Sequence, residues 1–260
     1  MKIRLRQKEF HMETVGPVDH HSLLRTIVLS LIPGILILLF LILFAPLANQ
    51  FGLSSTLVLF AAIALVLVPF ELGYLLLLGK KLNGRFSLKG IILFHEKIPL
   101  WQFFVFIPLL LLWTIFCFAV ISPKIDHFFI DNFFTWLPKW FFANGFTQNA
   151  GQYSKTVLIL TIILGFVFNG LVGPIVEELY FRGYLLPRLG QTGRWAPLLN
   201  VVLFSLYHLF SPWQNATRIL ALLPLVYVVW WKRNIVIGIV THCSLNILGM
   251  IAMLVFLNKA

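Results

Sequence analysis

Long apolar runs separated by short polar stretches dominate the pattern along this chain. Five runs carry no formal charge: residues 26–70, 98–123, 156–176, 195–217 and 234–258. Because a helix rises about 1.5 Å per residue, roughly 20 apolar residues are enough to cross a bilayer. The first run is too long for one crossing, and its polar stretch from Pro46 to Ser55 predicts a turn between two helices.

The pattern therefore predicts an all-α fold, a polytopic transmembrane helical bundle of about seven or eight spans. We place seven spans at residues 26–47, 56–78, 101–121, 157–186, 197–210, 217–231 and 234–257. The sixth span rests on a short charge-free run that contains Pro224. An eighth, partly inserted helix fits within residues 122–156, an aromatic stretch that is typical of an interfacial belt and also compatible with a lateral substrate entrance.

Composition and charge agree with a membrane protein. Hydrophobic residues make up 60% of the 260 residues and charged residues 11%, whereas about a quarter of a soluble domain is charged. Of the 20 Lys and Arg, five lie in the N-terminal segment up to Arg25, five between residues 80 and 97, and two each in the segments at 188–194 and 232–233. These 14 residues share one side of the predicted topology, which indicates a cytoplasmic N terminus.

The same distribution explains the net charge of +11. The basic residues lie in short loops beside spans, so we expect anionic lipid headgroups rather than nucleic acid as their partners. The N-terminal segment is too charged to resemble a cleavable signal peptide. Both cysteines, Cys117 and Cys243, fall within predicted spans, so no disulfide framework is predicted.

Few ionisable residues lie inside the spans, and each is informative because a charge at the bilayer centre costs at least about 2.5 kcal/mol. Glu71 follows Pro69 in the second span, where a structural role is the simpler interpretation. In the C-terminal half, Glu177, His208 and His242 lie on three different predicted helices. Each is about 13 to 16 Å from the cytoplasmic end of its helix, so the three share a similar depth.

Spacing within these helices predicts which side chains stack. Glu178 and Arg182 are four residues apart, and so are Phe204 and His208, and His242 and Asn246. Glu177 points about 100° away from Glu178 around the helix. We therefore expect an ion pair between Glu178 and Arg182, and Glu177 directed at the histidines. Pro174 cannot bond to the carbonyl of Gly170 and should open the helix there.

Each of these residues alone has a structural interpretation. A single pair of Glu178 with Arg182 is an ordinary salt bridge, a single histidine in a bundle is as often a packing residue, and Asn246 alone is typical of interhelical hydrogen bonding. The joint occurrence of Glu177, His208, His242 and Asn246 at one depth favours a chemical site. A proton relay of a transporter uses the same residue types, but the chain shows no inverted repeat and no matched pair of broken helices.

A carboxylate beside an imidazole can hold and deprotonate a water molecule. A second imidazole and an amide, here those of His242 and Asn246, can donate hydrogen bonds to the oxyanion that forms when the water attacks a carbonyl. Together these groups predict hydrolysis of an amide within the membrane.

Three motifs also resemble a known family. Gly173-Pro174-x-x-Glu177-Glu178-x-x-Phe181-Arg182-Gly183, then Phe204-x-x-x-His208, then His242-x-x-x-Asn246 are similar to the signature motifs of the CAAX protease and bacteriocin-processing (CPBP, or Abi) intramembrane proteases. That family includes the type II CAAX prenyl endopeptidases. The resemblance covers roughly residues 155–250, whereas residues 1–150 contribute only generic membrane helices.

The resemblance implies a division of the chain and of the roles in the site. A cytoplasmic N-terminal segment (1–25) would precede N-terminal transmembrane helices and loops (26–154) and a catalytic transmembrane core (155–257). By the resemblance, Glu177 would activate water with His208, His242 and Asn246 would form the oxyanion hole, and Glu178 and Arg182 would support them. We expect no cofactor. Zinc held by Glu177, His208 and His242 is the alternative, which we disfavour because neither histidine's own helix carries a carboxylate placed to orient it.

The resemblance does not determine the substrate. Eukaryotic members act on prenylated CAAX proteins, and many bacterial relatives are linked to peptide processing or bacteriocin immunity. We expect an intramembrane endopeptidase acting on a membrane-associated protein or peptide, in a bacterial cell membrane because the chain is compact with short loops. The alternative is a non-catalytic immunity or scaffold protein of the same family.

Overall fold

The computed structural model describes residues 20–142 and 145–257, and in these ranges every element is helical. Three long helices begin at a serine whose hydroxyl accepts the hydrogen bond of a backbone N–H in the first turn. Ser22, Ser54 and Ser154 cap them in this way. These caps satisfy backbone donors that have no partner within the helix, and therefore define where each helix starts.

Five continuous helices in the described residues are long and apolar enough to cross a bilayer. Two of them, α1 (Leu23–Gln50) and α12 (Ile235–Leu257), are α-helical throughout. The other three combine α-helical and π-helical segments: α2, η1 and α3 (Ser55–Ala62, Ile63–Leu67, Val68–Asn83); α4, η2 and α5 (Leu100–Phe116, Cys117–Ile121, Ser122–Phe133); and α7, η5, α8, η6 and α9 (Lys155–Leu164, Gly165–Val172, Gly173–Glu177, Glu178–Leu185, Leu186–Arg188). The all-α polytopic bundle predicted from the hydropathy pattern is confirmed.

Two of the predicted spans differ from the others. The helix α10 (Ala196–Tyr207) has 12 residues and is about 18 Å long, which is shorter than the hydrocarbon core of a bilayer. It packs against α11 (Asn215–Lys232), and neither helix is among the five that could span a membrane by length and composition. The helices expected at 197–210 and 217–231 are therefore present as a hairpin of α10 and α11 packed within the bundle.

Two boundaries also differ from expectation. The helix α1 continues through Pro46 to Gln50, so the turn before α2 is shorter than predicted. The additional helix expected within 122–156 is partly α5, which extends the α4 helix. The described residues of the rest of this stretch form three short helical turns: η3 (Lys139–Phe141), α6 (Gly145–Gln148) and η4 (Ala150–Gln152). A proline is tolerated inside a membrane helix when neighbouring groups satisfy the freed carbonyl.

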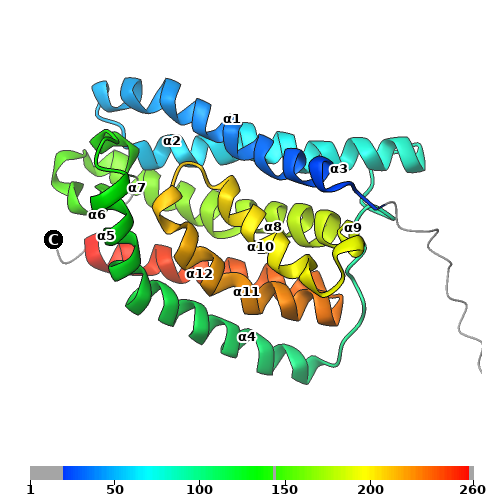
Figure 1. The fold of residues 1–260 in the computed structure, drawn as a ribbon. Coiled ribbons are helices and arrows are strands. Elements are labelled where there is room, and N and C mark those ends of the chain that lie inside the picture. Colours follow the sequence, from blue (N-terminus) through cyan, green and yellow to red (C-terminus); the bar gives the residue numbers. More distant parts are fainter. Residues whose placement is uncertain (1–19, 143–144, 258–260) are drawn as a thin grey trace, which may run out of the picture.

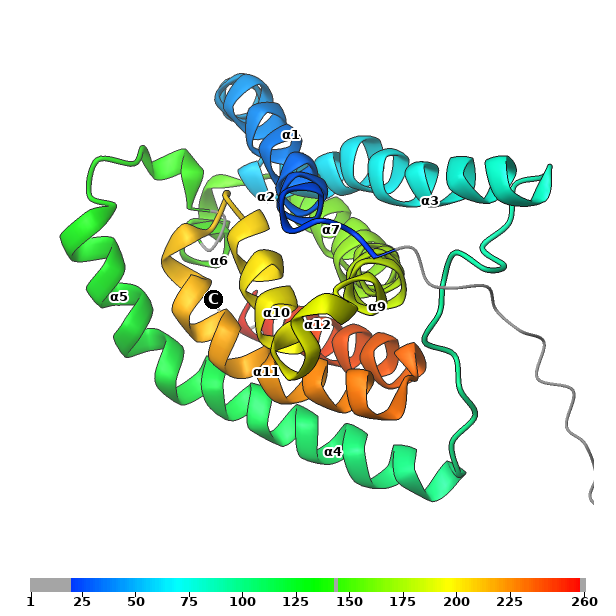
Figure 2. The same ribbon diagram turned by 45° about the vertical axis from the view of Figure 1, so that its right-hand side comes forward.

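The hairpin of α10 and α11 lies in the middle of the bundle. The helix α1 packs on α10 and α2, while α4 packs on α11 and α12, so the hairpin is covered on both sides (Figure 1). The same arrangement is visible after a turn of the molecule, with α3 projecting away from α4 (Figure 2). The connections η7 (Gly190–Trp195) and residues 84–99 lie at one end of the bundle, and the stretch from η3 to η4 lies at the other.

Backbone hydrogen bonds tie the 84–99 connection to the helix ends beside it. The N–H of Leu93 donates to the carbonyl of Gly183, and the N–H of Ile235 donates to the carbonyl of Phe94. His95 and Asn234 form an antiparallel bridge. These bonds hold the start of α12 beside η6, and thereby set the position of two helices that carry predicted site residues.

Candidate active site

The π-helical stretch around Pro174 delivers two glutamates into the core. Pro174 lacks the N–H that would bond to Gly170, and the helix passes through π-helical geometry in η5 and η6 on either side of α8 without breaking. Glu177 is 7% exposed and Glu178 is fully buried. The helix therefore opens near Pro174 as expected, by widening to π-helical turns on either side of α8.

The structure brings Glu177 and both histidines together. Oε1 of Glu177 lies 3.9 Å from Nε2 of His208, and Oε2 lies 3.8 Å from Nε2 of His242. Both separations are too long for direct hydrogen bonds. They are short enough for a single water molecule to contact an imidazole nitrogen and a carboxylate oxygen at once.

His208 is held by the end of α10. It is the residue directly after the last helical residue, so it is not within a helix as predicted, although its ring still packs on Phe204 at 4.9 Å between centroids. Its Nδ1 lies 2.8 Å from the carbonyl oxygen of Phe204. Because a carbonyl only accepts, Nδ1 carries the proton, and in the neutral imidazole Nε2 faces Glu177 as an acceptor.

His242 is oriented by Glu178 from another helix. Its Nδ1 lies 3.1 Å from Oε1 of Glu178, and the same oxygen lies 3.2 Å from Nη1 of Arg182. The predicted pair of Glu178 with Arg182 is present, and Glu178 has a further role that spacing along one helix did not show. The lack of a suitable carboxylate on either histidine's own helix therefore does not disfavour zinc, because Glu178 reaches His242 from a different helix.

Arg182 is the largest fully buried side chain of the described residues. Its guanidinium carbon lies 4.0 Å above the ring centroid of Phe204, which provides a cation–π contact in addition to the ion pair. Glycine at 238 makes room for the partner carboxylate, because a Cβ there would lie 2.5 Å from Oε2 of Glu178. The supporting pair is thus packed between η6, α10 and α12.

Asn246 lies one turn beyond His242 on α12. Its amide nitrogen donates to the backbone carbonyl of Asn169 in η5 at 2.8 Å. An amide nitrogen carries two hydrogens, so this bond leaves a second donor. The bond also joins α12 to the helix that carries Glu177, which orients the amide.

Two further residues at the site, Tyr207 and Arg218, escaped the sequence reasoning. Tyr207 donates a hydrogen bond to Oε1 of Glu177. Arg218 is buried, and its guanidinium donates to the side chains of Ser211 and Gln214, which fastens the loop that carries His208. Glu71, which was predicted to lie in the second span, is fully buried and close enough to Glu177 and Arg182 to interact with their charges.

No charge pattern could have located Tyr207, because a tyrosine in an apolar run resembles an ordinary packing residue. Arg218, a buried arginine in the hairpin, was a detectable signal, since a charge in an apolar helix requires partners.

Within the parts of the chain that the structure describes, no group of three or more His, Cys, Asp or Glu side chains is arranged to hold a metal ion.

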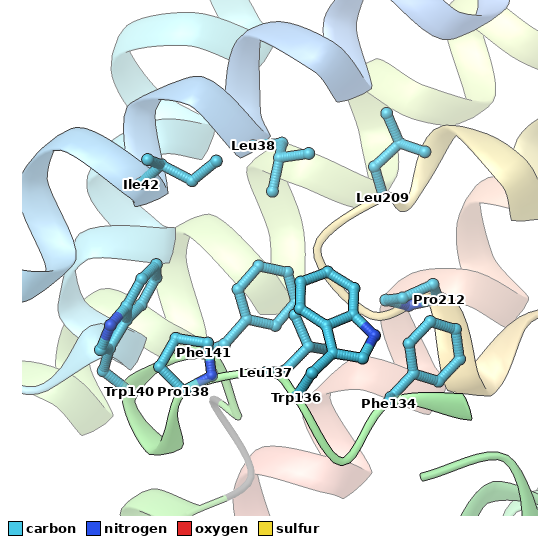
Figure 3. A pocket seen from close by; sticks show the side chains of 10 residues that line it. All are labelled: Leu38, Ile42, Phe134, Trp136, Leu137, Pro138, Trp140, Phe141, Leu209 and Pro212. Carbon is cyan, nitrogen blue, oxygen red and sulfur yellow. The ribbon is translucent and has the colours of Figure 1, made fainter. Parts of the chain in front are cut away.

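An apolar cavity of about 300 Å³ lies beyond the tip of the hairpin, toward the end of the bundle that carries η3 (Figure 3). Leu38 and Ile42 of α1 and Leu209, the residue after His208, face Trp136 and Trp140 across it. Trp213 at the hairpin tip packs edge-on or tilted against aromatic rings of the same stretch: Phe134, Phe141 and Phe142. The aromatic residues predicted to form a belt therefore cover the hairpin.

These features define an integral membrane protein of the polytopic α-helical class, with a buried carboxylate, two imidazoles and an amide of the kind that hydrolases use. Residues 159–248 match the family model described as type II CAAX prenyl endopeptidase, Rce1-like. The matched segment contains every predicted site residue, and it confirms the resemblance to the CAAX protease family. No curated protein and no solved structure matches the chain.

The match supports an intramembrane protease of the CAAX type in general terms, acting on a membrane-associated protein. It covers about a third of the chain. The helices before residue 159 lie outside it, although α1 packs directly on α10.

Proposed function

We propose that the chain is an intramembrane endopeptidase in which Glu177 activates a water molecule without a metal ion. The observation that carries the proposal is the 3.9 Å gap between Oε1 of Glu177 and Nε2 of His208. A water in this gap can donate one hydrogen to each atom, which leaves an oxygen lone pair free for attack on a peptide carbonyl.

The reaction then needs one proton acceptor and one oxyanion site. As the water oxygen bonds to the carbonyl carbon, its proton passes to Glu177 and the carbonyl becomes an oxyanion. When the C–N bond breaks, Glu177 returns that proton to the leaving amine, and the products are a carboxylic acid and an amine. Hydrogen bonds from His242 and Asn246 would stabilise the oxyanion between these steps.

The contact with Glu178 determines which protonation form of His242 could donate a hydrogen bond to the oxyanion. Nδ1 donates to Glu178, so Nε2 carries a hydrogen for the oxyanion only when His242 is an imidazolium. Oε1 of Glu178 contacts both this imidazole and the guanidinium of Arg182, so one buried carboxylate serves two partners. In this proposal the supporting pair therefore orients the oxyanion donor.

Zinc is the alternative to this mechanism. Glu177, His208 and His242 are chemically suited to it, and each histidine donates its other ring nitrogen to a carbonyl or carboxylate, as zinc ligands usually do. As they stand, however, these side chains do not form a metal-binding group, so zinc would require them to move.

The substrate in this proposal is a membrane-associated protein or peptide cut in the half of the bilayer nearer the N terminus. We propose that the N terminus is cytoplasmic, because the basic connections at 84–99, 189–195 and 232–234 lie at one end of the bundle, where anionic lipid is the expected partner. We propose a bacterial cell membrane because the chain is compact with short loops. Nucleic acid has no role in the proposal. The name of the matched family makes a prenylated CAAX peptide the first substrate to test.

The test compares wild type, Glu177→Gln and Glu96→Gln in liposomes with a membrane-tethered peptide, prenylated or not. Glu96 is a matched control, because it is exposed and paired with Arg233. We expect Glu177→Gln to lose cleavage at least a thousandfold with unchanged thermal unfolding, and Glu96→Gln to remain active. Full activity of Glu177→Gln would refute the assignment of the base. A cellular phenotype that survives Glu177→Gln would favour the non-catalytic immunity or scaffold role.

Metal dependence needs a separate measurement. Elemental analysis of active protein should find less than stoichiometric zinc, and a membrane-permeant chelator should leave the rate unchanged. Loss of activity that zinc restores would establish the metal alternative.

A further inference from the structure

The phenol of Tyr207 is the only direct hydrogen-bond donor to Glu177 within the described residues, and the proposed mechanism makes no use of it. Its side chain is fully buried, at the last position of α10 and directly before His208. A buried hydroxyl that bonds the proposed base rather than a backbone group deserves a functional explanation.

The two oxygens of Glu177 have different surroundings. Oε1 accepts from Tyr207 and faces His208, whereas Oε2 faces His242 at 3.8 Å. A free glutamate side chain has several rotamers, and fixing one of them costs conformational entropy. The hydrogen bond from Tyr207 selects the rotamer that keeps Oε1 beside His208.

Tyr207 is itself held rigidly on several sides. Its ring packs on the rings of Phe181 and His208, with centroids 5.1 Å and 4.3 Å away. On its backbone side, α1 approaches so closely that a Cβ at Gly34 would lie 1.8 Å from the carbonyl oxygen of Tyr207. The backbone that carries the phenol is therefore held against α1, which lies outside the segment that matches the protease family.

We propose that Tyr207 is a positioning residue for Glu177: its hydroxyl, held in place by the close contact of α1 with the end of α10, keeps Oε1 at the distance from His208 that a reacting water requires. This inference rests on the proposed function for its catalytic consequence. The positioning itself is a property of the folded protein and can be measured without any turnover.

The chain offers a matched control in Tyr180. This tyrosine is also fully buried, but its hydroxyl donates to the backbone carbonyl of Leu29 at 2.9 Å instead of to Glu177. Both Tyr→Phe changes remove one buried hydroxyl, so a general loss of packing or stability should appear in both variants.

The kinetic experiment measures kcat and KM of wild type, Tyr207→Phe and Tyr180→Phe on a membrane-tethered peptide. We expect Tyr207→Phe to lower kcat about tenfold to a hundredfold with KM within twofold, because a misplacement of about 1 Å in a catalytic group has costs of this order. Tyr180→Phe should keep kcat within twofold. Equal kcat values for both variants, or parallel changes of kcat and KM, would overturn the inference.

An infrared experiment separates this inference from the proposed function. Protein labelled with ¹³C at its glutamate carboxyls is compared with Glu177→Gln to identify the Glu177 carboxylate band. We expect Tyr207→Phe to shift or broaden that band, because it loses a direct donor, and Tyr180→Phe to leave it in place. An unmoved band in Tyr207→Phe refutes the positioning role whether or not the protein cleaves peptides, whereas a shifted band in a protein without protease activity supports positioning and refutes the proposed function.

Discussion

Removal of the arginine from the buried ion pair should destabilise the protein strongly. Arg182 and Glu178 are both fully buried, 3.2 Å apart, and the guanidinium also lies on the face of Phe204. In Arg182→Met the carboxylate of Glu178 remains in the core and keeps only His242, which is charged only when protonated, as its partner. Breaking a buried pair by removal of one partner typically costs about 3 to 5 kcal/mol, because the remaining charge is uncompensated.

The assay is reversible unfolding in mixed micelles with increasing SDS, monitored by tryptophan fluorescence. Arg233→Met is a matched control, since Arg233 pairs with Glu96 at 3.7 Å but both side chains are about two-thirds exposed. An exposed pair contributes at most about 1 kcal/mol. The double variant Glu178→Gln with Arg182→Met should recover much of the lost stability. The glutamine introduced at position 178 carries no charge, and its amide oxygen can still accept a hydrogen bond from His242.

The reasoning would be refuted if Arg182→Met lost no more stability than Arg233→Met. It would also be refuted if the double variant were as unstable as Arg182→Met, because the cost would then come from lost packing rather than from an unpaired charge. A double-mutant cycle over the two positions provides the coupling free energy directly.

Two glycine substitutions test close contacts beside the site. Gly34→Ala would put a Cβ 1.8 Å from the backbone oxygen of Tyr207, so α1 must move, and we expect a loss of about 3 kcal/mol or more in SDS unfolding, whereas Gly73→Ala, with nothing within 4 Å of the new Cβ, should change stability by less than about 1 kcal/mol. Gly238→Ala would displace the carboxylate of Glu178 and should lower kcat in the liposome assay, and an unchanged kcat would show that this carboxylate does not orient the proposed oxyanion donor.

Hydropathy and helical spacing predicted much of the site because the relevant signals are local. A four-residue spacing places Glu178 and Arg182 on one face of any helix, and the structure has their ion pair. The three motifs also pointed to the family that residues 159–248 match. The number of crossing helices was harder to predict, because a 12-residue apolar helix resembles a short span until its partners are known.

The sequence by itself determined that the chain is a helical membrane protein and that a few ionisable side chains lie at one depth, because the cost of burying charge in lipid makes such residues rare. Only the tertiary structure decided their partners. Glu178 orients His242, and Tyr207 donates a hydrogen bond to Glu177. Gly34 of α1 has no side chain and so leaves room for the carbonyl of Tyr207 at the end of α10. These contacts join helices far apart in the chain, so they depend on how the helices pack, which no periodicity within one helix records.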